Sequence, residues 1–167
     1  MSLKEEAKHE IQWTVEKFMA KDGKEIIEKN IKPYEVIKAA PHNCLLHEGI
    51  ATFLGLMCAI GSETAYSNAA ARIGVGNDAT APADTQTGLI GASSLYKAMN
   101  ATYPSKSGDH DIVFQSDFVS GEAEWAWLEE SIDNGSSPNK NLCRQNTSLG
   151  TKPSGQTWRL SGTITWT

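Results

Sequence analysis

A chain of 167 residues is long enough to bury a hydrophobic core without disulfides or metal, and its length suits one domain. Its composition, 40% hydrophobic and 21% charged, is that of a globular protein and excludes wholesale disorder. The formal net charge of -5 argues against direct nucleic-acid binding, because proteins that wrap a duplex usually carry a basic patch or stripe.

The cysteines and the N-terminus indicate where the protein is made. Cys44, Cys58 and Cys143 are an odd number without CxxC spacing, so we expect no disulfide framework and synthesis in a reducing cytoplasm. The opening sequence, MSLKEEAKHEI, has no apolar core of a signal peptide. The longest apolar stretch, residues 50–60, is too short to span a bilayer, so we expect no membrane partner.

The first 33 residues are densely and evenly charged. Within them Ile11, Trp13 and Val15 alternate with polar residues, which is the period of a strand. Asp22 and the following glycine predict a turn, and residues 24–32 fit a loop or a short helix. We therefore interpret residues 1–33 as a charged N-terminal arm or an edge strand. On this interpretation, deleting them leaves a foldable domain.

Residues 34–38 predict a second short strand, and a helix follows it. Asn43 is a suitable N-cap for a helix over 44–58. Apolar side chains recur along this segment at helical spacing, which predicts an amphipathic helix with one buried face. The residues of that face are Leu46, Ile50, Phe53, Leu54 and Met57.

The rest of the chain predicts short strands separated by Gly, Pro, Asn and Ser turns. The expected strands cover 71–75, 96–103, 111–119, 123–132, 141–149 and 157–166. Asp84 could cap a short second helix near 87–90. The predicted fold is mainly β: an antiparallel β-sandwich or open barrel with one amphipathic helix and a short second helix. Residues 34–167 form a single β-sandwich domain in this interpretation.

Two clusters resemble ligand sites only superficially. His42, Cys44 and His47 lie close together, but their spacing matches no common zinc pattern. The glycines at 74–76 follow a strand, yet they lack the third glycine and the Lys-Ser/Thr of phosphate-binding loops. We expect no metal, no cofactor and no catalytic residue.

The densest run of acidic residues has two interpretations. Paired carboxylates could serve glycoside hydrolysis, but on alternating strand positions a solvated rim is the favoured reading. The run consists of Glu122, Glu124, Glu129, Glu130 and Asp133.

Five tryptophans are an excess for this length. Aromatic side chains on strands mostly fill a core, and Trp158 lies in a clean alternation that predicts burial with Leu160 and Ile164. Trp125 and Trp127 share a predicted face and could belong to the core or to a contact surface. Our candidate interface residues are Trp125, Trp127, Glu124, Lys24 and Lys29.

Several stretches of the sequence are distinctive. They are NCLLHEGI at 43–50, ARIGVGND at 71–78, TQTGL at 85–89, KAMN at 97–100 with YP at 103–104, FVSGEAEW at 118–125, SLGTK at 148–152 and TWRLSGTIT at 157–165. Together they resemble a family of small structural proteins of tailed-phage virions. The order is also similar to that of the N-terminal domains of phage tail-collar fibres. The resemblance implies a virion component without catalysis, made in the host cytoplasm.

The expected function is that of a capsid decoration or cement protein, which binds the assembled shell as a homo-oligomer. The chain is expected to end on its last core strand, without a fibre shaft, and residues 1–33 look like an arm that could cross a neighbour. The expected partners are the major capsid protein or tail and collar proteins. A tail or collar fibre adaptor is the alternative of the same kind. A carbohydrate-binding module using exposed Trp125 and Trp127 is the alternative of a different class.

Overall fold

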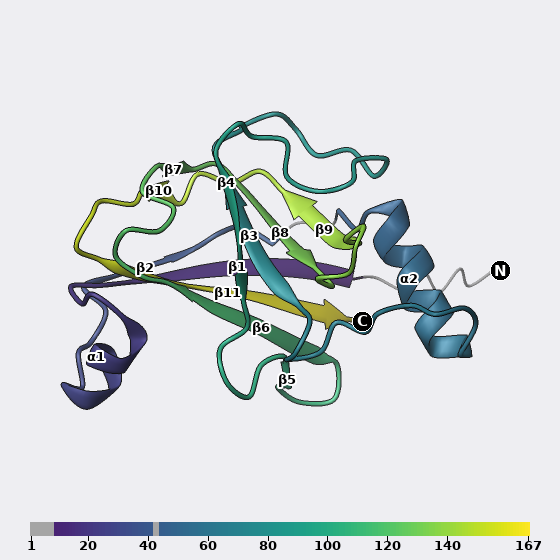
Figure 1. Ribbon diagram of the computed structural model, residues 1–167, viewed down its shortest axis with the longest axis horizontal. Helices are drawn as coiled ribbons and strands as arrows, with labels where there is room; N and C mark the ends of the chain where they lie inside the picture. The colour runs from purple at the N-terminus through teal and green to yellow at the C-terminus, as the bar shows by residue number, and fades with distance from the viewer. Residues whose placement is uncertain (1–8, 42–43) are drawn as a thin grey trace, which may run out of the picture.

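The computed structural model of the protein describes residues 9–41 and 44–167, and this part contains two large antiparallel sheets and a two-stranded ribbon (Figure 1). The first sheet holds, in spatial order, β2 (Glu35–Lys38), β1 (His9–Phe18), β11 (Thr157–Trp166), β6 (Asp111–Phe118) and β5 (Ser105–Lys106). The second holds β4 (Ser94–Ala98), β3 (Arg72–Gly76), β8 (Glu129–Asp133) and β9 (Asn141–Gln145). A small ribbon joins β7 (Ala126–Trp127) to β10 (Gly150–Thr151).

The strand β1 is an interior strand of the first sheet. It pairs with β11 along its whole length and with β2 on its other side. The alternation predicted for residues 11–15 is confirmed: Ile11, Trp13 and Val15 are buried in the main core. The expectation of an edge strand is wrong for residues 14–17, where β2 pairs with the side of β1 that would otherwise be free.

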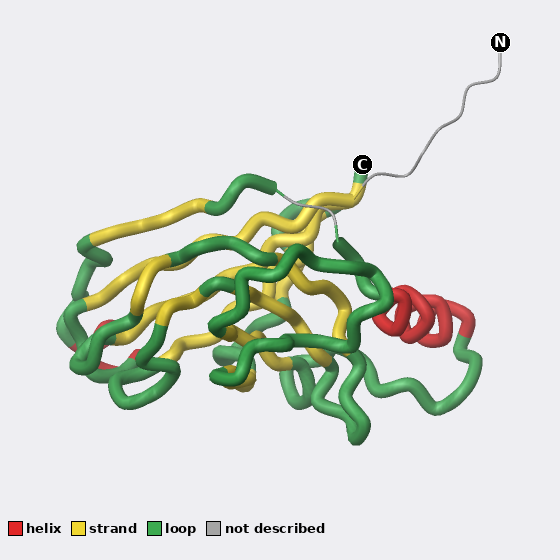
Figure 2. The backbone as a smooth tube through the Cα atoms, turned by 90° about the horizontal axis from the view of Figure 1, so that it is seen from above, coloured by secondary structure: helices red, strands yellow, loops and turns green. Residues whose placement is uncertain are grey.

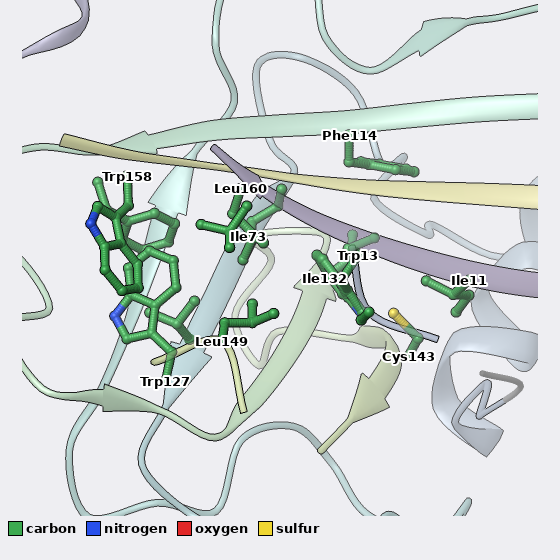
Figure 3. Close-up of a cluster of buried hydrophobic side chains, with 14 of the residues drawn as sticks. Ile11, Trp13, Ile73, Phe114, Trp127, Ile132, Cys143, Leu149, Trp158 and Leu160 are labelled. Carbon is green, nitrogen blue, oxygen red and sulfur yellow. The ribbon is translucent and has the colours of Figure 1, made fainter. Parts of the chain in front are cut away.

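The two sheets face each other across one hydrophobic core (Figure 3). The first sheet contributes Trp13 from β1 and Trp158 and Leu160 from β11, while the second contributes Ile73 and Ile132. As predicted, Trp158, Leu160 and Ile164 of the last strand are buried. Trp127 and Trp158 meet edge to face with ring centroids 4.9 Å apart. Such aromatic pairs add stabilisation beyond the area that they bury.

Two helices lie at opposite ends of the molecule (Figure 1). The first, α1 (Gly23–Glu28), begins where the Asp22 carboxylate accepts a hydrogen bond from the Glu25 backbone N–H at 2.8 Å. The second, α2 (His47–Cys58), confirms a helix in the predicted segment 44–58, although it begins three residues later than predicted. Its N-cap is Leu46; Asn43, the predicted cap, lies outside the described residues.

The fold class is confirmed as mainly antiparallel β with two helices. The short second helix is α1, however, and residues 87–90 form no helix. Residues 77–93 instead make one long irregular connection between β3 and β4. Its polar backbone groups find partners in buried side chains of β8 and β9, as described below, so no helix is needed to satisfy them.

Candidate interaction surface

The helix α2 turns its small residues toward the sandwich. Its buried residues are Gly49 and Thr52. The backbone of β9 is so close that a Cβ added to Gly49 would lie 2.5 Å from the Cα of Leu142. A carboxylate oxygen of Glu48 accepts a hydrogen bond from the backbone N–H of Asn141 at 2.7 Å. The helix is thereby fixed against β9 at one end of the molecule (Figure 2).

A neighbouring side of α2 carries large apolar side chains that are exposed. The exposed fractions are 38% for Ile50, 42% for Phe53, 48% for Leu54, 64% for Met57 and 70% for Ile60, which follows the helix. We call these five residues the α2 outer face. The predicted burial of the helix's apolar face is therefore wrong except at Leu46, which is fully buried. The glycine, and not the bulky stripe, meets β9 because only a residue without a Cβ permits so close an approach.

An apolar groove of about 440 Å³ lies beside the α2 outer face. Side chains of α2 form one wall, and the ends of β6 and β11 form another. The lining residues include Phe53, Leu56 and Met57 from α2, and Ile112, Phe114, Ile164 and Trp166 from the strands. The indole of Trp166 stacks on the ring of Phe53 with centroids 5.7 Å apart. The helix and the last strand therefore build one continuous apolar surface.

A second apolar hollow of about 260 Å³ lies beside the N-terminal half of α2. Ile50 and Leu54 line it together with His9 and Trp166. The ring of His9 also contacts that of Trp166 at a centroid distance of 5.4 Å. The apolar surface thus continues from the groove, past the helix, to the beginning of β1.

The acidic run at 122–133 is not a solvated rim. Glu129, Glu130 and Asp133 are fully buried on β8, so the favoured reading is wrong for these three; Glu124 alone is clearly exposed. The Asp133 carboxylate accepts two hydrogen bonds from the guanidinium of Arg72, at 2.9 and 2.5 Å. Burial is tolerated here because each ionised group has a partner of opposite charge.

Glu129 forms a fully buried ion pair with Arg144 of β9. The Nε of Arg144 donates to Oε2 of Glu129 at 2.8 Å. The same carboxylate accepts from the backbone N–H groups of Ile90 and Gly91, at 3.1 and 2.7 Å. The Nη1 of Arg144 donates to the Thr80 carbonyl at 3.1 Å and to the side-chain oxygen of Gln86. The pair therefore fastens the long 77–93 connection to the second sheet.

Glu130 faces the other way, into the core, because neighbouring residues of a strand point to opposite faces. Its two carboxylate oxygens are buried and have no hydrogen-bond partner among the described residues. Burial, and next the charge of Glu129, raise the pKa of this carboxyl well above its usual range. The buried surroundings of Glu130 therefore favour the neutral form of its carboxyl.

The candidate interface residues do not form one surface. Trp127 is fully buried, with its ring 4.8 Å from that of Phe118, so its assignment to an interface is wrong. Trp125 is half-buried and packs against the main core. Glu124 is exposed, and its carboxylate accepts a hydrogen bond from the backbone N–H of Gly121 at 2.8 Å.

The two lysine candidates belong to α1 and its C-cap, at the end of the molecule opposite α2 (Figure 1). Each forms an ion pair within its own helical segment: Lys24 with Glu28 at 3.5 Å, and Lys29 with Glu25 at 2.6 Å. Exposed pairs of this spacing contribute little to stability, and nothing joins them to the apolar surface.

The histidine and cysteine cluster near α2 does not assemble within the described part of the chain. His42 lies outside the described residues, and the Nε2 of His47 faces the Asp84 carboxylate at 3.1 Å. Burial raises the pKa of Cys44 above its usual value, and that of Cys143 to about 12. Among residues 9–41 and 44–167, no group of three potential ligands could hold a metal ion.

Four residues of the α2 outer face, all but Ile60, were predicted from the sequence as an apolar face, but as a buried one. The overlooked signal was the distribution of apolar residues around the helix axis. Neighbouring helical residues are turned by about 100°, and apolar side chains recur over most of the turn while Gly49 marks the side of close approach. A helix that is apolar nearly all round has to be covered on more than one side.

Comparison with known proteins gave no match: no family model, no curated protein and no solved structure matches this chain. In the part of the chain that the structure describes, no helix has the length and apolar character to cross a membrane.

Proposed function

We propose that this chain is a structural protein of a tailed-phage virion that works by binding other proteins. The observation that carries the proposal is the α2 outer face with its adjoining groove. Monomeric proteins seldom expose contiguous apolar patches of more than a few hundred Å², and larger patches are typical of interaction sites. The surface is anchored to the sandwich, because Gly49 packs on β9 and Phe53 stacks on Trp166.

The places of the family-like stretches support a scaffold rather than a chemical site. TQTGL at 85–89 supplies Gln86, whose side-chain oxygen accepts from buried Arg144. SLGTK at 148–152 supplies Lys152, which is buried and donates to the Val119 carbonyl at 2.9 Å. The stretch at 157–165 lies in β11, between β1 and β6. Each of these stretches supports the sandwich itself.

Within this class we propose a capsid decoration protein that binds the assembled shell. A tail or collar adaptor would use the same kind of contact at another place on the particle. The carbohydrate-binding alternative loses its main support, because Trp127 is fully buried and Trp125 packs on the core. A glycan array tests that alternative directly, and we expect no ligand.

Cryo-electron microscopy of the particle encoded with this chain tests the proposal. We expect density that fits the sandwich on the outer surface of the capsid shell. Density among tail or collar proteins would support a virion role and overturn decoration. If mass spectrometry of purified particles does not detect the chain, the virion role itself is wrong.

The role of the α2 outer face is tested separately with Leu54→Glu. We expect this variant to fold and to be incorporated into particles at least tenfold less than the wild type. Ile27→Glu on α1 is the matched control, since Ile27 is an exposed apolar residue at the other end of the molecule. Equal incorporation of both variants would show that the α2 outer face is not a contact surface.

A further inference from the structure

The α2 outer face has the spacing of a helix–helix contact. Ile50, Phe53, Leu54 and Met57 follow the i, i+3, i+4, i+7 pattern by which one helix packs along another. Ala51 and Cys58, which flank this stripe on the helix, are also exposed and uncharged. A partner helix would therefore meet an uninterrupted apolar strip.

The size of this face fits the apolar part of a stable interface. Taking about 200 Å² for a fully exposed large side chain, the five residues expose about 500 Å² of surface. A standard interface buries about 800 Å² on each partner, and roughly 60% of that is apolar. The α2 outer face alone supplies that apolar share.

The two ends of the face differ in shape. Its most prominent side chains, Met57 and Ile60, lie at the C-terminal end of α2, while the 260 Å³ hollow lies beside Ile50 near the N-terminal end. In an antiparallel pair of α2 helices related by a twofold axis, the C-terminal end of each helix lies opposite the N-terminal half of the other. The projecting side chains of each copy then meet the hollow of its partner.

The charges of α2 do not oppose this pairing. The only acidic residue of the helix is Glu48, which is directed to Asn141 on the sandwich side. No charged side chain of α2 lies in the stripe, so the stripe itself brings no like charges together in a twofold pair. An antiparallel pair also aligns opposite ends of the two helix dipoles, which is favourable.

We infer that the occupant of the α2 outer face is a second copy of this chain, bound through an antiparallel, twofold α2–α2 contact. This inference rests on the proposal that the face is an interaction surface, and it names the partner. An isologous contact of this kind uses one patch on both copies and closes at a dimer.

Sedimentation equilibrium of the full chain tests the inference. The wild type should sediment as a dimer at micromolar concentration. Leu54→Glu and Met57→Glu should each weaken dimerisation on the order of tenfold or more, whereas Ile27→Glu should leave it unchanged. Circular dichroism confirms that the variants fold. A monomeric wild type, a dimer that persists in both α2 variants, or equal weakening by Ile27→Glu would overturn the inference.

Cross-linking gives a second measurement that does not depend on introducing charge. In a Cys58→Ser background, Leu54→Cys should form an intermolecular disulfide under mild oxidation, and Ile27→Cys should not. Cross-linking at position 27 but not at 54 would overturn the α2 contact.

Failure of the inference can be distinguished from failure of the proposed function. A monomeric wild type whose incorporation into particles still depends on Leu54 would mean that a different virion protein covers the face. A dimer held by α2 in a chain that is absent from particles would leave the inference standing and overturn the virion role.

Discussion

Arg144 and Glu129 lie beside each other on adjacent strands, both fully buried, with Nε and Oε2 2.8 Å apart. Glu129 is held on three sides, by Arg144 and by two backbone N–H groups of the 77–93 connection. An ion pair in this position fixes a long irregular segment that has no helix or strand of its own. Its removal should therefore affect both global stability and the local order of that segment.

Replacing Arg144 by Met should destabilise the protein by about 3–5 kcal/mol, because it leaves the Glu129 carboxylate buried without its cation. Urea unfolding measures the loss. Limited proteolysis should show new cleavage within 77–93 in the same variant. Lys24→Met, which breaks an exposed ion pair, is the control and should change stability by no more than about 0.5 kcal/mol. A loss of under 1 kcal/mol for Arg144→Met would contradict the role of the pair.

Glu130 should make stability depend on pH. Because burial raises its folded-state pKa above the unfolded value of about 4.3, the folded protein binds this proton more tightly than the unfolded chain. Its contribution is fully favourable below the unfolded pKa and is lost as pH rises through the folded pKa. Glu130→Gln should therefore match the wild type near pH 4 and exceed it in stability at higher pH. Denaturant unfolding near pH 4 and at higher pH measures this difference. An unfolding free energy that changes with pH equally in the two proteins would contradict the prediction.

Trp158→Ala should cost roughly 3–5 kcal/mol, because it opens a cavity where the Trp158 ring meets Trp127. Trp125→Ala is the comparison, since Trp125 is only half-buried and should cost less. Thermal unfolding measures both changes. A shift of under a few degrees for Trp158→Ala would mean that this ring does not support the core.

Deleting residues 1–33 should abolish cooperative folding. The sequence alone predicted a foldable remainder, but the deletion removes β1, which separates β2 from β11, and with it the fully buried Trp13. Neither neighbouring strand would keep its partner along that side. Circular dichroism and one-dimensional NMR test this expectation. A truncated chain with dispersed amide resonances and sigmoidal unfolding would show that the remaining strands close the sheet without β1.

Gly49→Ala should loosen α2 from β9, at a cost of about 1–3 kcal/mol, because the new Cβ meets the Leu142 backbone. Gly55→Ala is the matched control on the same helix. The Cβ added there first meets the flexible side chain of Glu63, and alanine favours the helix. Amide hydrogen exchange should be faster across α2 in Gly49→Ala only. Equal exchange in the two variants would mean that Gly49 does not set the helix's position.

Where apolar and polar residues alternate cleanly, the sequence alone is enough to predict a strand, because alternation reports a local property of the backbone. The less regular segments were predicted wrongly: the strand expected over 96–103 ends at Ala98, and that expected over 123–132 is divided between β7 and β8. Residues 11–15 and 157–166 carry that alternation, and both lie in the predicted strands. The helix over 44–58 was found for the same reason, at a period of 3.6. The short second helix was expected near residues 87–90 but lies at Gly23–Glu28. For that segment the sequence allowed either a loop or a helix, and the Asp22 side chain caps a helix there.

What each face of a helix or strand contacts depends on how the elements pack together. The sequence of α2 indicated a large apolar stripe but not which side of the helix would pack on β9. Because the helix contacts β9 closely at Gly49, the stripe is left exposed. The acidic residues of β8 looked solvated, since their partners, Arg72 and Arg144, lie on other strands. Strand pairing brings these charges together across long sequence separations, and no local pattern encodes such a pairing. Burial and exposure of charged and apolar groups are therefore decided when the sheets form.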